Sequence, residues 1–105
     1  MRNILPVIAT VLCMSRAIAQ ENYIPPHGFV PDERTAVAIA RAVLIPIYGA
    51  KQIGAEEPLT ARRMGGAWEV TGTIPCLKEG RCVGGAADVK LSATDGQILF
   101  VTHYK

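Results

Sequence analysis

The chain has 105 residues, half of them hydrophobic, with 11 basic and 9 acidic side chains and a formal net charge of +2. This length allows one domain at most. Because Arg2 and Arg16 belong to an apolar N-terminal segment, the rest of the chain carries equal numbers of basic and acidic residues. A neutral domain with interspersed charges lacks the clustered basic face that nucleic-acid binding requires, so we exclude that class.

Residues 1–19 have the pattern of a secretory signal peptide. Arg2 gives a positive start, an apolar run follows, and small residues stand at the two positions that signal peptidase reads, ending at Ala19. The run is shorter than the roughly 20 residues that span a bilayer. We therefore expect cleavage between Ala19 and Gln20, which leaves one periplasmic or secreted domain, 20–105, without membrane attachment.

Cysteine spacing predicts a disulfide in the exported chain. Cys13 leaves with the signal segment, and Cys76 and Cys82 remain. An even pair of cysteines usually closes in an oxidising compartment. A metal site or a redox pair is the alternative, but five intervening residues match neither the zinc-knuckle nor the thioredoxin-like spacing.

The stretch Pro31–Gly49 is the one segment with a long helical apolar repeat. Asp32 is suited to cap the first turn. Pro46 should kink or end the helix, and Gly49 can adopt the left-handed stop conformation. The apolar stripe expected to face a sheet consists of Ala36, Ile39, Ala40, Val43 and Ile47.

After a polar connection over Ala50–Glu57, the chain reads as strands separated by glycine-containing turns. Alternation of apolar and polar residues predicts one buried and one solvated face. We therefore predict an α+β fold with one N-terminal helix packed on an antiparallel meander of about four strands. The expected strands are Pro58–Met64, Ala67–Pro75, Ala86–Ala93 and Gln97–His103.

The first and last strands differ in charge. Arg62 and Arg63 place one arginine on each side of the first strand, a pattern that blocks edge pairing. The last strand, Gln97–His103, is nearly all apolar, which suits a strand covered on both faces or one completing a dimer interface.

Candidate chemistry is sparse. His27 and His103 could in principle form an acid/base pair or a metal site with Asp88 or Glu69, but no spacing supports this. The more common reading is that both histidines meet water. Trp68 is expected to anchor the core. We expect no catalytic residue, no cofactor and no metal.

Several short motifs together resemble the bacterial immunity-protein family with a nuclear-transport-factor-2-like fold, which protects producers of secreted toxins. Their order and spacing carry the likeness, which covers nearly all of 20–105. The motifs are V-P-D before the helix, P-I-Y-G at its end, W-x-V-x-G-T-x-P in the second strand, and D-G-x-I-L-x-V-T-H at the end.

The resemblance implies a shortened nuclear-transport-factor-2-like or cystatin-like domain that binds and neutralises a protein toxin rather than turning over a substrate. The export signal and the cysteine pair depart from the family pattern and imply a partner outside the cytoplasm. One alternative is a small-ligand binder or enzyme of the same fold. Another is a regulator of an envelope enzyme, since the helix-plus-meander pattern also looks like the PepSY domain.

The loop Cys76–Gly85 is the first candidate for docking such a partner. A bridged loop loses little entropy on binding, and this one presents Lys78, Glu79 and Arg81 together. The equally weighted alternative is that these are ordinary solvated turn residues. The next candidate is the solvated strand face with Glu69, Asp88 and Lys90.

Overall fold

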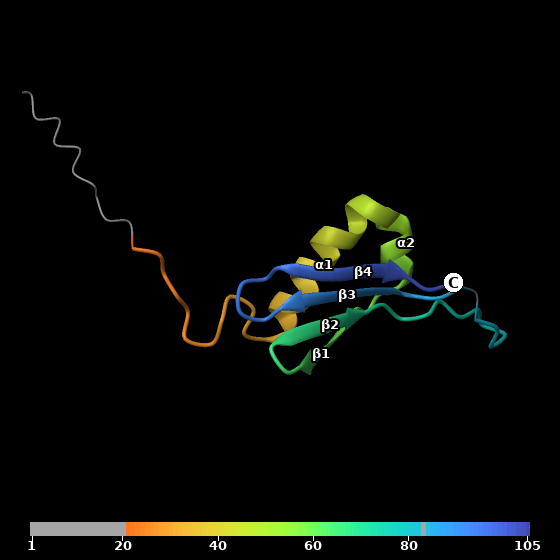
Figure 1. The fold of residues 1–105 in the computed structure, drawn as a ribbon. Coiled ribbons are helices and arrows are strands. Elements are labelled where there is room, and N and C mark those ends of the chain that lie inside the picture. The colour runs from red at the N-terminus through yellow and green to blue at the C-terminus, as the bar shows by residue number, and fades with distance from the viewer. Residues whose placement is uncertain (1–20, 83) are drawn as a thin grey trace, which may run out of the picture.

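The structure, a computed structural model, describes residues 21–82 and 84–105. Two helices lie on one face of a four-stranded antiparallel sheet of order β1-β2-β3-β4 (Figure 1). This confirms the α+β arrangement predicted from the sequence. Among the described residues, no helix has the length and hydrophobicity to cross a membrane. The elements are α1 (Glu33–Tyr48), α2 (Ala50–Ala55), β1 (Thr60–Met64), β2 (Ala67–Thr71), β3 (Ala87–Ser92) and β4 (Ile98–His103).

The two predicted signals at the ends of α1 are present. Asp32 Oδ1 accepts a hydrogen bond from the backbone N–H of Thr35 at 2.8 Å, which satisfies a donor of the first turn. Gly49 ends the helix with φ of 94°, and its N–H donates to the Ile45 carbonyl. Pro46 lies within the last turn, so the helix continues past it to Tyr48.

The buried face of α1 differs from the predicted stripe. Ala36 and Ala40 are buried as expected, but the third buried residue is Leu44, while Ile47 is 55% exposed. Successive steps of four residues align Ala36, Ala40 and Leu44 along one line of the helix. The prediction that Ile47 is buried was wrong, and Val43 lies half-buried beside this line.

The segment predicted as a polar connection, Ala50–Glu57, contains the short helix α2. Its support is one buried side chain, Ile53, whose backbone N–H donates to the Gly49 carbonyl. A helix of six residues is too short to show a helical period, and glycine at position 54 is unfavourable inside a helix. The sequence therefore predicted a polar connection here, and the short helix was missed.

Alternating residues of β2 and β3 form the sheet side of the core. Trp68 and Val70 on β2 face Leu91 and Val89 on β3 in register, and all four are buried. The indole Nε1–H of Trp68 donates to the Val30 carbonyl at 2.8 Å, so its polar atom is satisfied. The prediction that Trp68 anchors the core is confirmed.

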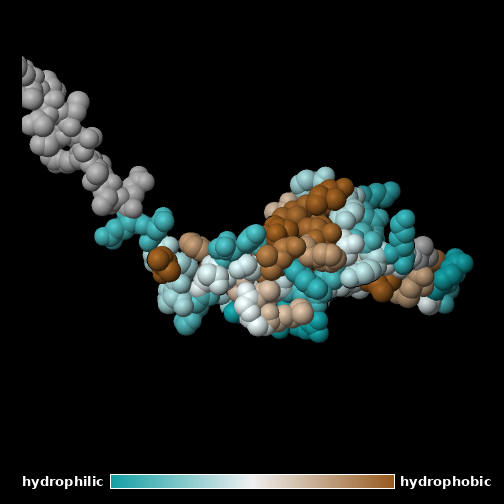
Figure 2. Space-filling view, in the orientation of Figure 1, coloured by the Kyte–Doolittle hydropathy of each residue, from teal (hydrophilic) through white to brown (hydrophobic). Residues whose placement is uncertain are grey.

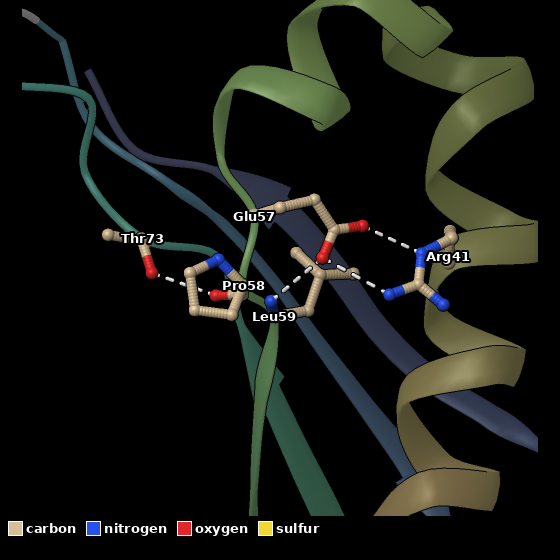
Figure 3. A network of polar contacts seen from close by, with 5 residues as sticks. All are labelled: Arg41, Glu57, Pro58, Leu59 and Thr73. Atoms are coloured by element: carbon tan, nitrogen blue, oxygen red, sulfur yellow. Dashed lines mark hydrogen bonds and ion pairs between the residues drawn. The ribbon is translucent and has the colours of Figure 1, made fainter.

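A polar corner joins α2 to β1 (Figure 3). The Glu57 carboxylate binds Arg41 of α1 through two hydrogen bonds, at 2.7 and 3.1 Å, and also accepts from the backbone N–H of Leu59. The Thr73 hydroxyl donates to the Pro58 carbonyl at 2.8 Å. The Arg41 hydrogen bond holds the pKa of Glu57 below its usual range. This corner fixes the start of β1 under α1.

β4 lies at an edge of the sheet and is more exposed than predicted. Leu99 is 54% exposed and Phe100 is 44% exposed, so the part of the chain that the structure describes does not cover both faces of the strand. Leu99 also falls at a bulge, where the register with β3 shifts. The expectation of double coverage was wrong, whereas the alternative of an interface strand stays a prediction.

Candidate functional site

The most buried polar group among the described residues is the carboxylate of Glu56, which follows α2. Its Oε1 accepts from the backbone N–H of Ala87 at 2.7 Å. Its Oε2 accepts from the Gln52 amide at 2.8 Å and lies 2.7 Å from Nε2 of His103. One side chain thus ties α2 to the first residue of β3 and the last residue of β4.

The charge of Glu56 is held by these partners. Burial alone raises the pKa of the carboxyl, but hydrogen bonds from Gln52, Ala87 and His103 outweigh that effect and bring the pKa below its usual range. Glu56 is therefore ionised at neutral pH. Because a carboxylate can only accept, His103 Nε2 is the donor, which fixes the tautomer of a neutral imidazole.

His103 stands beside an open pocket of about 740 Å³. Its ring packs on Tyr48 of α1 with centroids 5.2 Å apart and remains partly exposed. The pocket is lined by Tyr48, Gln52, Thr102, His103, Tyr104 and Lys105, among others. A carboxylate behind an oriented imidazole at a pocket is an arrangement that can accept a proton or bind a polar ligand.

Gly72 makes room for this buried carboxylate. A Cβ atom at position 72 would lie 2.6 Å from Oε1 of Glu56 and 3.0 Å from its Cβ atom. Gly72 also pairs through its backbone, since its N–H donates to the Ala87 carbonyl. Residue 72 must therefore lack a side chain while Glu56 occupies its present position.

The loop expected to dock a partner forms a small hairpin beyond the sheet. Cys76 and Cys82 are joined by a disulfide, and their Cα atoms lie 3.9 Å apart. The Leu77 N–H donates to the Arg81 carbonyl, which closes the turn between them. The predicted bridge is therefore present in the structure.

The three charged residues of this hairpin are all exposed. Arg81 Nη2 lies 3.0 Å from Glu79 Oε1, and Lys78 is exposed beside them. Exposed pairs of this kind contribute about 1 kcal/mol at most. The hairpin therefore presents its charges to solvent and does not use them to hold the fold.

The second predicted surface, the sheet face opposite the helices, is less solvated than expected. Glu69 accepts a hydrogen bond from Arg62 at 2.7 Å, which lowers the pKa of Glu69. Asp88 is buried, and burial together with the adjacent Glu69 raises its pKa. The prediction that Asp88 is solvated was wrong, because Asp88 lies on an inner strand with neighbours on both sides.

The structure separates the acid/base partners considered from sequence. Glu69 and Asp88 lie on the open sheet face, whereas His103 pairs with Glu56 on the helix side, so the reading of His103 as solvated was wrong. His27 lies in a turn before α1 and lines a different pocket from His103. The expected cleavage point between Ala19 and Gln20 lies outside the described residues.

Sequence reasoning missed Glu56 and Gln52 as site residues. Glu56 sits in a segment read as a polar connection, and 47 positions separate it from His103. The one available signal was that an acidic residue, Glu56, follows an apolar residue, Ile53, at a spacing of three. The pairing itself follows from how α2 packs against the end of the sheet.

The comparisons with known proteins identify one family. A family model described as an NTF2 fold immunity protein matches residues 35–105, which includes most of α1, all of α2 and the whole sheet. No curated protein and no solved structure matches the chain.

Proposed function

Because the chain belongs to the NTF2 fold immunity protein family, we propose that it is an exported immunity protein that binds and neutralises a secreted bacterial toxin. The match over residues 35–105 is the observation that carries this proposal. Neutralisation by binding requires a stable complementary surface and no turnover of a substrate. We therefore assign no catalytic role to the chain in this function.

Two features support an exported site of action. The N-terminal segment has the pattern of a cleavable signal, and the hairpin carries a disulfide, which forms and persists in oxidising compartments. The mass of the protein recovered from the periplasm should match a chain beginning at Gln20, less two hydrogens for the Cys76–Cys82 bridge. Retention of residues 1–19 or two free thiols would contradict this part of the proposal.

The function itself is tested by finding the toxin. The protein is used to capture partners from extracts of the producing cell, and each captured protein is expressed alone and together with the immunity protein. The expected partner arrests growth when expressed alone and loses that effect with the immunity protein present. If every stable partner is harmless alone, the immunity role is wrong.

The disulfide hairpin is the proposed docking element for the toxin. Lys78, Glu79 and Arg81 are exposed on a short turn closed by the bridge, so binding to them requires little ordering of the chain. Changing all three to alanine should weaken toxin binding without changing the melting temperature. The matched control changes Glu69 and Lys90 on the open sheet face. Unchanged binding by the hairpin variant would transfer docking to that face.

A second candidate function is favoured by the pair Glu56 and His103 beside the open pocket. This arrangement is compatible with binding or acting on a small polar ligand. His103→Gln distinguishes the two functions, because it removes the proton acceptor from the pocket while keeping a polar side chain. Full toxin protection by this variant favours the inhibitor, and loss of a measured ligand affinity or turnover favours the alternative.

A further inference from the structure

Among residues 21–82 and 84–105, no strand lies beside the outer row of β4 backbone groups. β4 is the last strand in the order β1-β2-β3-β4. The Tyr104 N–H donates to the Ala86 carbonyl, and antiparallel pairs alternate between hydrogen-bonded and non-hydrogen-bonded positions. The backbone N–H and C=O groups of Val101 and His103 therefore point away from β3, toward the free edge.

The side chains of this edge lack the usual protection against pairing. Residues 98–102 carry no charge and no proline, and Leu99 and Phe100 are both substantially exposed. Edge strands normally carry charges or proline because an unprotected edge is a template for another strand. The opposite edge, β1, has that protection in Arg62 and Arg63.

An apolar surface on α1 continues from this edge. α1 packs across β1, β2 and β3, and its last turn reaches the end of β4 where Tyr48 contacts His103. Ile47 is exposed and Val43 is half-buried on the flank of α1. Figure 2 shows hydrophobic residues gathered over α1 and the adjoining part of the sheet. A second strand along β4 would bring a further apolar layer against this flank.

We propose that the occupant of this edge is a second copy of the chain, paired antiparallel through β4 about a two-fold axis at Val101. In this register Phe100 faces Thr102 of the second copy, and Leu99 faces its His103. No acidic, lysine or arginine side chain opposes its own copy, so self-pairing has no electrostatic cost. The two sheets then form one continuous eight-stranded sheet.

Two-fold pairing of β1 with a second copy is unfavourable, so dimerisation should use β4 and not β1. A two-fold antiparallel pairing of β1 centred on Arg62 or on Arg63 would place that arginine opposite its own copy. Because residues 98–102 of β4 are uncharged, they cannot attract a charged partner strand. The observations therefore favour a second copy over a charged partner strand. This inference goes beyond the proposed function, because the dimer forms with or without a toxin.

The test measures the mass of the protein, expressed from its full coding sequence and purified as the cell delivers it, by light scattering and sedimentation over a dilution series. The wild type should have twice the mass of one chain at high concentration. The double variant Leu99→Lys, Phe100→Lys should have the mass of one chain, since both lysines meet the partner strand. Met64→Lys is the control, because Met64 is an apolar residue on the other edge with an exposure similar to that of Phe100, and this variant should stay dimeric.

Amide hydrogen exchange gives a measurement that does not depend on a variant. The N–H groups of Val101 and His103 should be protected in the dimer and should lose protection on dilution. A wild type with the mass of one chain at every concentration would overturn the proposal. A double variant that stays dimeric would do the same. A monomeric wild type whose toxin binding is lost in the double variant would assign the edge to the toxin instead.

Discussion

The two edges of the sheet are built differently, although two adjacent residues hold them. Glu57 binds Arg41 in a partly exposed ion pair beside β1, whereas Glu56 turns inward and binds the ends of β3 and β4 from a fully buried position. β1 carries two arginines, one on each face of the strand, and β4 carries none. The edge protected by charge, β1, is therefore held by the weaker contact, Glu57 with Arg41. The unprotected edge, β4, is held by the stronger one, Glu56 with Ala87 and His103.

The largest expected effect comes from removing the anchor of β4. Glu56→Ala leaves the Ala87 N–H and the Gln52 amide without their acceptor and opens a cavity, so unfolding free energy should fall by about 3 kcal/mol. Chemical denaturation measures this loss. Gln52→Ala is the control, because it removes one partner and leaves the carboxylate in place. A loss no greater than that of the control would show that Glu56 does not anchor the edge.

Acid should weaken the β4 anchor without any mutation. Because the pKa of folded Glu56 is lowered, its ionised form stabilises the fold above the usual glutamate range, and this stability is lost as pH falls through the folded pKa. Asp88 acts in the opposite direction, since a raised pKa favours the folded state on protonation. Unfolding free energies between about pH 6 and about pH 3 should fall more steeply for the wild type than for Glu56→Gln. Parallel curves would contradict the assignment.

A smaller effect is expected at the corner that holds β1. Glu57→Ala removes a bidentate pair whose side chains are 40% and 37% exposed, so solvent screening limits the loss to about 1 kcal/mol. Added salt should reduce the difference between the variant and the wild type. The denaturation experiment used for Glu56→Ala gives the ratio of the two losses of unfolding free energy. A loss equal to that of Glu56→Ala would remove the contrast between the edges.

The smallest change in stability is expected when the protection of β1 is removed. Replacing Arg62 and Arg63 with threonine should alter unfolding free energy by about 0.5 kcal/mol or less, since the Arg62–Glu69 pair is a single contact and the Arg62 side chain is 71% exposed. The variant should instead self-associate at lower concentration than the wild type, because β1 then resembles β4. Sedimentation measures this. Unchanged association would show that the arginines do not guard the edge.

The fold was largely predictable because its signals are local. Asp32 and Gly49 mark the ends of α1, and alternation in residues 67–71 and 87–92 marks two inner strands. The buried line of α1 was less predictable, since Leu44 and Ile47 are equally apolar and only the position of the sheet distinguishes them. α2 escaped prediction because six residues are too few for a period.

The candidate site was predictable only in part. The Cys76–Cys82 bridge was predictable from the spacing of the two cysteines and from the expectation, based on residues 1–19, that the chain is exported. The pairing of Glu56 with His103 is a long-range contact between a helix end and a strand end, which no local pattern encodes. The burial of Asp88 likewise depends on strand order rather than on the alternation that placed it on the open face.

The absence of a side chain at Gly72 links two positions that are 16 residues apart in the chain. Alanine or serine at position 72 is compatible with the fold only after glutamate at position 56 has been replaced. Once position 56 has a smaller residue, position 72 can vary. Glycine at 72 should therefore be inherited together with glutamate at 56. A Gly72→Ala change should be harmful beside Glu56 and nearly silent once position 56 is alanine.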